Sequence, residues 1–161
     1  MSVELFQVDY ANAVHADQLV MLLNQYACDP MGGAKPLPDS IKASLAESLS
    51  NVPGAFSLIA TVDGQPAGLT NCFEGFSTFA CQPLINVHDL AVSPDYRGQG
   101  ISQVLLRGIE AEAKSRGCIK VTLEVLGGNT IAKNAYQKYG FESYELDPSA
   151  GSAELWQKYL D

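Results

Sequence analysis

Apolar residues follow two different periods along the first third of the chain, and each period predicts a different element. Alternation of apolar and polar side chains over Val3–Val8 predicts a strand, whereas apolar residues three and four positions apart in Val14–Tyr26 predict a helix. Asp29–Pro38 holds three prolines and two glycines, which interrupt both periods and predict a loop. A second helix is expected to follow, capped by Asp39 or Ser40.

The middle of the chain has the pattern of a sheet. Two runs rich in apolar and β-branched residues flank the dipeptide Asp63-Gly64, whose residues tolerate the left-handed conformations of a tight hairpin turn. The strands that this pattern predicts are Phe56–Val62, Ala67–Phe73 and Leu84–Val92.

Helix and strand patterns alternate in the C-terminal half. Apolar residues recur with helical spacing from Ile101 to Arg116, and Gly117 stands where this helix should end. The further elements predicted are a buried strand at Ile119–Val125, a short helix at Thr130–Tyr139 stopped by Gly140, and terminal strands at Glu142–Leu146 and Ala153–Tyr159. The order of elements predicts a single α/β domain over residues 1–161.

Composition narrows the classes of protein that fit. The chain is 47% apolar, which suffices for a core without metal or disulfide support. No apolar run reaches the length of a membrane span, and the N-terminus lacks the features of a signal peptide, so we expect a cytoplasmic protein with no membrane partner. The net charge is −8 and no basic run occurs, so nucleic acid is not an expected partner.

The four cysteines are scattered along the chain and form no C-x-x-C pair. Their surroundings are mostly apolar, which is typical of buried free thiols rather than of disulfides or a zinc site. We therefore predict no metal site.

The most informative stretch is Val92–Ser102, V-S-P-D-Y-R-G-Q-G-I-S, which follows a predicted strand and opens a predicted helix. The first turn of a helix has backbone N–H groups without intrahelical acceptors and a partial positive charge. Gly98 and Gly100 allow the main chain to approach an anion closely, and Arg97 can donate to two oxygens. The stretch therefore predicts a diphosphate site.

Two common phosphate-binding loops do not fit this stretch. A Walker A loop requires Gly-Lys-Ser/Thr, and residues 97–103 contain no lysine, which disfavours ATP or GTP hydrolysis. A dinucleotide-binding fingerprint requires a third glycine where Gln103 stands.

The loop resembles motif A of the GCN5-related N-acetyltransferases (GNAT), Arg/Gln-x-x-Gly-x-Gly/Ala. Residues 97–102 read R-G-Q-G-I-S, with Ser102 in place of the final Gly or Ala. A later segment, Asn129-x-x-Ala132-x-x-x-Tyr136-x-x-x-Gly140-Phe141, is similar to motif B of the same family. The resemblance implies a mixed, mostly antiparallel sheet of six to seven strands, flanked by about four helices, whose central strands splay apart.

The resemblance also implies acetyl-CoA as the cofactor. Its pantetheine arm would lie between the splayed strands 84–92 and 119–125 and bond the main chain like an additional strand, where an N–H could polarise the thioester carbonyl. Asn129 can also cap the helix that follows it. The coenzyme-binding residues implied are Leu90, Ala91, Val92, Arg97, Gly98, Gln99, Gly100, Ile101, Ser102, Asn129 and Tyr136.

Acetyl transfer to a primary amine requires a general acid and a general base. Tyr136 stands where the family places the acid, although an aromatic residue in this helical stripe is also typical of core packing. Two residues are candidates for the base. His88 stands where relatives often have Glu or His, and Glu124 stands where peptide N-terminal acetyltransferases have a catalytic Glu. The two remain alternatives, and a water relay could engage either.

Asp89 matches an acidic position that binds the substrate amine in polyamine-type relatives. Neighbouring residues of a strand point to opposite faces, so His88 and Asp89 can share a pocket only if the strand is bulged there. Selectivity for the acceptor is expected from residues 29–38 and 71–83. In the latter, Phe73, Phe76 and Phe79 could form an apolar wall with a charge at Glu74, or they could equally pack a hairpin, which is favoured for Phe73.

The acceptor itself is left open as a primary amine of a small molecule or peptide. The acidic net charge favours polyamines, amino sugars or basic peptides, but it serves solubility equally well. The alternative function is a non-catalytic module that senses acyl-CoA, against which the retention of Tyr136 with His88 or Glu124 argues. A homodimer is expected from the resemblance alone.

Overall fold

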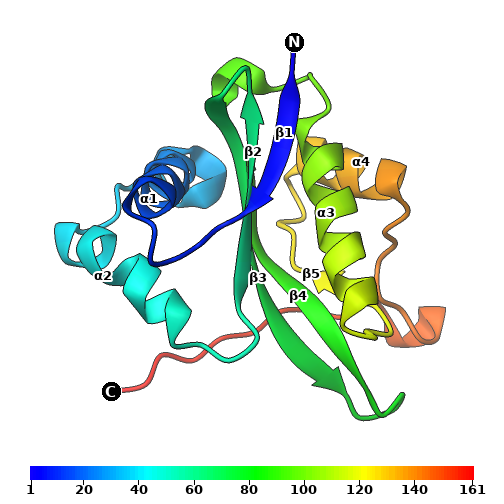
Figure 1. Ribbon diagram of the computed structural model, residues 1–161. Helices are drawn as coiled ribbons and strands as arrows, with labels where there is room; N and C mark the ends of the chain where they lie inside the picture. The colour runs from blue at the N-terminus through cyan, green and yellow to red at the C-terminus, as the bar shows by residue number, and fades with distance from the viewer. The chain divides into compact units, whose positions relative to one another are not determined.

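Five strands form one mixed sheet in the computed structural model, which describes residues 1–161 (Figure 1). The strands lie in sequence order, with β1 to β4 antiparallel to one another and β5 parallel to β4. They belong to the first of two units into which the chain divides, residues Met1–Leu123 and Glu124–Asp161. Their bounds are β1 Val3–Gln7, β2 Phe56–Val62, β3 Gln65–Ser77, β4 Gln82–Val92 and β5 Val121–Leu123.

Four α-helices accompany the strands, as expected, together with three short 3₁₀ helices. The α-helices are α1 Ala13–Cys28, α2 Asp39–Ser50, α3 Ile101–Ser115 and α4 Thr130–Tyr139. The 3₁₀ helices are η1 Pro30–Gly32, η2 Pro94–Tyr96 and η3 Pro148–Ala150.

The start of α2 differs from the expectation. Asp39 is already the first helical residue, and Pro38 occupies the N-cap position without a side-chain hydrogen bond. Asp39 and Ser40 therefore do not cap the helix. The Asp39 carboxylate lies in the first turn, where it interacts favourably with the helix dipole.

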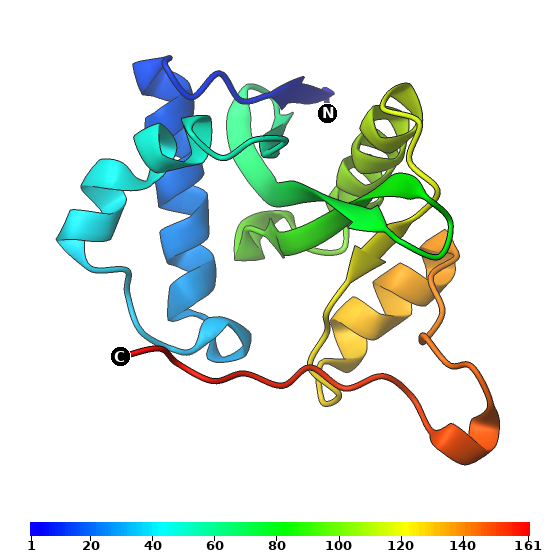
Figure 2. The same cartoon turned by 90° about the horizontal axis from the view of Figure 1, so that it is seen from below.

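Helices cover both faces of the sheet in the first unit. Figure 2 shows α1 and α2 on one side and α3 on the other. Leu19 and Leu22 of α1 and Leu49 of α2 are buried against Ile59 and Leu69 of the sheet. On the opposite face α3 approaches closely where the sheet has no side chain: a Cβ at Gly68 would lie 2.9 Å from Ile101 Cγ2. This glycine places the N-terminus of α3 directly over the end of β4.

The sheet has five strands rather than six or seven. β5 spans only Val121–Leu123, although the predicted strand extends from Ile119 to Val125, and its residues are half-buried rather than buried. The two predicted terminal strands, Glu142–Leu146 and Ala153–Tyr159, are absent, and Glu145 of the first segment forms only an isolated bridge with Ser152, the residue before the second segment. Alternation predicts which side chains share a face, but a strand also needs a neighbour that supplies hydrogen bonds along its length.

None of the helices is both long enough and apolar enough to cross a lipid bilayer.

Candidate active site

A β-bulge in β4 determines which side chains face the α1 and α2 side of the sheet. Asn71 of β3 pairs with Asp89, whereas the next residue, Cys72, pairs with Val87, so His88 is an extra residue without a partner position. A bulge shifts the alternation of a strand by one residue. His88 and Asp89 therefore both line one cavity, which is the condition under which two strand neighbours can share a pocket.

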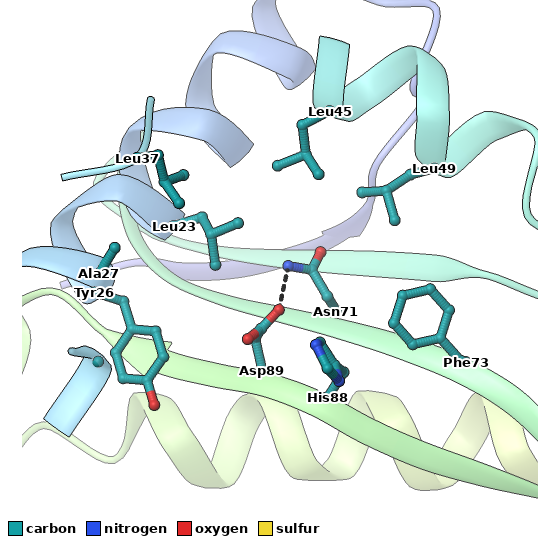
Figure 3. Close-up of a pocket in the computed structure, with 11 residues that line it drawn as sticks. Leu23, Tyr26, Ala27, Leu37, Leu45, Leu49, Asn71, Phe73, His88 and Asp89 are labelled. Atoms are coloured by element: carbon teal, nitrogen blue, oxygen red, sulfur yellow. Dashed lines mark hydrogen bonds between the residues drawn. The ribbon is translucent and has the colours of Figure 1, made fainter. Parts of the chain in front are cut away.

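The cavity lies between α1 and α2 on one side and β3 and β4 on the other (Figure 3). Its volume is about 330 Å³. The polar side chains on the strand side are Asn71, His88 and Asp89, and Phe73 stands beside His88 with ring centroids 5.5 Å apart in an edge-to-face arrangement. The remaining lining residues come from the helices and the segment between them: Leu23, Tyr26, Ala27, Gly32, Leu37, Leu45 and Leu49.

The proline-rich segment between α1 and α2 is held against α1 by hydrogen bonds. The backbone N–H of Leu37 donates to Asn24 Oδ1 at 2.9 Å, and the N–H of Lys35 donates to the Ala27 carbonyl at 3.0 Å. These bonds fix Gly32 and Leu37 at the cavity. Two residues of the segment 29–38 therefore line the cavity, and its use for the acceptor stays a prediction.

A chain of hydrogen bonds leads from the protein interior to Asp89. The Ser57 hydroxyl donates to Asn71 Oδ1 at 2.5 Å, and Asn71 Nδ2 donates to Asp89 Oδ2 at 3.0 Å. Tyr10 lies 2.8 Å from Ser57 Oγ, and because the Ser57 proton is engaged with Asn71, the Tyr10 hydroxyl is the donor to Ser57. Each residue thus donates to the next one in the direction of Asp89, whose carboxylate is the final acceptor.

Burial affects the two tyrosines near this chain of bonds. Desolvation is the largest cause that raises the pKa of Tyr10, and the same holds for Tyr26, whose pKa is raised further by the negative charges of Asp89 and Asp29. Both hydroxyls therefore stay protonated at neutral pH. They can act as hydrogen-bond donors there but not as bases.

The predicted phosphate loop has the backbone that its glycines suggest. Gly98 and Gly100 adopt φ of 76° and 79°, and a Cβ at either position would meet no atom within 4 Å. The left-handed backbone, not crowding by the protein, therefore selects glycine. The first N–H donors to the Gly100 carbonyl are Gln103 and Val104, so the N–H groups of Ile101 and Ser102 lie at the open N-terminal end of α3.

Arg97 connects this loop to the corner that follows α1. Its Nη2 donates to Asp29 Oδ2 at 3.1 Å, and its Nε donates to the Val92 carbonyl at 3.2 Å. Asp29 also accepts the N–H of Met31, and this backbone bond, followed by the bond from Arg97, lowers the pKa of the Asp29 carboxyl. The Arg97 side chain is half exposed.

The end of β4 has a free edge. β5 pairs with β4 only from Ile85 to Val87, so the strands separate beyond that point. The Ser93 N–H donates to the Ala67 carbonyl of β3, and main-chain groups alternate in direction along a strand. The groups of Ala91 therefore face β3, whereas those of Leu90 and Val92 face the free edge.

The motif B segment lies in the second unit, where its residues shape α4. Asn129 caps the helix by accepting the N–H of Ala132 at 3.2 Å. Gly140 ends it with φ of 116°, and the N–H of Phe141 donates to the Tyr136 carbonyl at 3.0 Å. The Phe141 ring packs against the buried Tyr136 ring at 5.9 Å, which is the hydrophobic contact that accompanies this type of helix end.

Two groups of residues differ from their expected positions. Glu74 accepts from Arg116 at 3.3 Å on the α3 face and does not line the cavity, and Phe76 and Phe79 are exposed. Phe73 alone of the three aromatic residues reaches the cavity, because its position in β3 shares a face with Asn71. Among the cysteines only Cys72 is buried, whereas Cys28 and Cys81 are exposed, and all four are free thiols.

Sequence reasoning missed Tyr10, Ser57 and Asn71 as a connected set. A signal was present, because Ser57 and Asn71 are small polar residues inside strands that are otherwise apolar. Buried polar side chains of this kind require partners. The sequence does not contain the register that makes these residues partners of one another.

Comparison with known proteins assigns the family. The model of the acetyltransferase (GNAT) family matches residues 20–141, and the chain belongs to this family. It is 36% identical over 85 residues to streptothricin acetyltransferase of Streptomyces lavendulae, a match that covers 53% of this chain and 43% of the relative. It is 32% identical over 99 residues to acetyltransferase SG1711 of Sodalis glossinidius (strain morsitans), covering 61% and 64%. The chain thus matches less than two thirds of either relative's length.

Solved structures share the fold at lower sequence identity. A ribosomal-protein-alanine N-acetyltransferase from Brucella melitensis biovar Abortus 2308 superposes with a TM-score of 0.72 at 21% identity, covering 99% of this chain and 98% of that one. AAC(6')-Iy in complex with the bisubstrate analog CoA-S-monomethyl-acetylneamine superposes with a TM-score of 0.77 at 20% identity, covering 99% and 100%. The fold is therefore that of the GNAT acetyltransferases.

Proposed function

We propose that this chain is an acetyl-CoA-dependent N-acetyltransferase that acetylates a primary amine. Membership of the family supports the reaction class. The observation that carries the proposal is the bulge at His88, which brings an imidazole and a carboxylate into one cavity next to the free edge of β4. An ammonium group can bind the carboxylate of Asp89, and the imidazole can accept its proton.

The residues of the loop fit a coenzyme with a diphosphate. The open end of α3 and the space next to Gly98 and Gly100 would admit phosphate oxygens, and Leu90 and Val92 would bond the pantetheine arm at the free edge. The fold relative AAC(6')-Iy forms a complex with CoA, which supports the same donor here. When bound, acetyl-CoA supplies the acetyl group as a thioester.

Side chains of the protein accept and donate the protons of the proposed reaction. His88, or alternatively Glu124, accepts a proton from the substrate ammonium, which frees the nitrogen lone pair for attack. Tyr136 is the proposed general acid and donates its hydroxyl proton to the departing sulfur. A new N–C bond replaces the C–S bond, and the second proton that the nitrogen loses restores the Tyr136 hydroxyl. The products are an acetamide, a free thiol and one released proton.

The two units are proposed to work as one acetyltransferase domain over residues 1–161. The family match supports this proposal because it runs from residue 20 to residue 141 and so continues past Leu123, where the first unit ends.

We also propose a homodimer as the state of assembly. Large apolar side chains remain exposed in the C-terminal segment, among them Leu155, Trp156 and Tyr159, and exposed apolar clusters are typical of association surfaces. Light scattering after size-exclusion chromatography should give twice the mass of the chain. The mass of a single chain at micromolar concentration would exclude the dimer.

The enzyme proposal is tested by comparing turnover with binding. Thiol release from acetyl-CoA is measured with a panel of primary amines, and coenzyme binding is measured separately by thermal shift. Amine-dependent thiol release is the expected result. Tight coenzyme binding without turnover of any amine would support a module that senses acyl-CoA and would overturn the enzyme proposal.

The role of Tyr136 has its own test. Tyr136→Phe should lower kcat by roughly 10²-fold, the scale for loss of a general acid, while the Kd for the coenzyme stays nearly constant. Tyr139→Phe, on the same helix, is the matched control and should retain kcat. Equal kcat values for Tyr136→Phe and the wild type would remove Tyr136 from the reaction.

A further inference from the structure

The helical wall of the cavity is mostly apolar. The helical side and the segment between α1 and α2 contribute Leu23, Ala27, Leu37, Leu45 and Leu49, and the strand side adds Phe73. Tyr26 also lines this side, but its hydroxyl donates to the Met31 carbonyl at 3.4 Å. A polyamine or an amino sugar carries several cationic or hydroxyl groups, each of which needs a partner when it leaves water. The aliphatic side chains of this wall offer none.

A single carboxylate lines the cavity. Asp89 is the one acidic residue among the lining side chains, and the nearby Asp29 is engaged with Arg97 and with the Met31 N–H. Glu74, which was expected to meet a cationic substrate, pairs with Arg116 on the other face of the sheet. The cavity is therefore matched to one positive charge.

The carboxylate is also oriented. Asn71 holds Oδ2 of Asp89, and Asn71 is itself held by Ser57. Asn71 and Ser57 are buried, so the half-buried Asp89 carboxylate keeps a fixed direction. The charge sits at the strand side of the cavity, opposite the leucines of α2 (Figure 3). A guest with an ammonium at one end and an apolar body at the other would satisfy both surfaces at once.

We propose that the acceptor is a monocationic primary amine attached to an apolar body, such as an arylalkylamine or a branched alkylamine. This inference rests on the proposed function and specifies its substrate class. The ammonium binds Asp89, and the apolar body packs against Leu45, Leu49 and Phe73. The cavity of about 330 Å³ is at the small end of ligand pockets, which favours a compact amine.

The test measures kcat/KM for thiol release with four amines: 2-phenylethylamine, isoamylamine, spermidine and neamine. The two apolar monoamines should have kcat/KM values at least roughly tenfold above those of spermidine and neamine, the scale of discrimination by an apolar pocket. A preference for spermidine or neamine would overturn this inference and leave the proposed function intact. Coenzyme binding with no turnover of any amine would instead overturn the proposed function.

Variants connect the preference to the cavity. Leu45→Ser should lower kcat/KM for 2-phenylethylamine by roughly tenfold and reduce its advantage over spermidine. Leu45→Met, which preserves volume and apolar character, should retain the preference. Ile41→Ser, on the exposed side of the same helix and outside the cavity, is the control for α2 stability. An unchanged preference in Leu45→Ser would place the apolar body elsewhere and contradict the inference.

Discussion

Asn71 is the residue on which the direction of the Asp89 carboxylate depends. Its amide bridges the Ser57 hydroxyl and Asp89, and it is buried, so no water can replace it without rearrangement. The chain of bonds ends at the one carboxylate of the cavity. In the proposed enzyme, the position of the substrate nitrogen would therefore depend on a residue that need not touch the substrate.

We expect Asn71→Ala to raise KM for the amine and to lower stability by about 1–3 kcal/mol, because it leaves buried polar groups without partners. Tyr10→Phe removes only the hydroxyl farthest from Asp89 in this series of hydrogen bonds and should change KM less. Steady-state kinetics and urea unfolding measure the two effects. An Asn71→Ala protein with wild-type KM would show that Asp89 does not need this support.

Arg97 makes a second residue-scale prediction possible. Arg97→Ala should weaken coenzyme binding by about 1.5–3 kcal/mol, the value of a hydrogen bond to a charged group, or roughly ten- to hundredfold in Kd. Isothermal titration with CoA measures the change. Arg107→Ala, an exposed residue on α3, is the matched control. Equal Kd values for the two variants would exclude Arg97 from the phosphate site.

At the scale of elements, predictions succeeded where local chemistry decides the structure. The helix over Thr130–Tyr139 has both predicted bounds because Asn129 caps its start and Gly140 ends it. The turn at Asp63-Gly64 likewise adopts left-handed φ at both residues. These features depend on side chains and backbone within a few residues of one another.

Predictions failed where distant partners decide the structure. The segment Glu142–Leu146 alternates like a strand but meets only one bridge partner, and β5 keeps three residues of the seven-residue strand predicted at 119–125. The bulge at His88 was stated only as a condition, because it depends on how β3 pairs with β4. Nothing in the local sequence fixes that register.

The close approach of α3 to β3 gives a prediction for an element. Gly68→Ala would place a Cβ 2.9 Å from Ile101 Cγ2 and 3.2 Å from the Ala91 carbonyl, so the start of α3 must move. We expect a lower Tm and a higher Kd for CoA together. Gly127→Ala, whose Cβ would meet no atom within 4 Å, should change neither. A loss of stability with unchanged CoA affinity would separate the helix start from the coenzyme site.

At the scale of the whole molecule, one buried thiol contributes to the dependence of stability on high pH. Burial is the main cause that raises the pKa of Cys72 from 9.0 to about 12. The folded state thus holds this proton more tightly than the unfolded chain. The resulting stabilisation is complete below pH 9 and is lost as the pH rises toward 12.

We therefore expect the free energy of unfolding to fall as the pH increases above 9, with a shallower decline in Cys72→Ala than in the wild type. Urea unfolding at pH 8, 9 and 10 measures these slopes. Cys81→Ala, which removes an exposed thiol, should keep the wild-type slope. Identical slopes in all three proteins would assign the alkaline decline to other groups.

The ion pair between Arg97 and Asp29 connects the predicted phosphate loop to the wall of the cavity. A phosphate that recruits the Arg97 guanidinium competes with Asp29, and Asp29 anchors the corner whose residue Gly32 lines the cavity. In the proposed enzyme, occupancy of the phosphate site would then alter the affinity of the cavity for the acceptor, and such coupling is reciprocal by thermodynamic necessity. This contact would make the affinity for each of the two substrates depend on whether the other is bound.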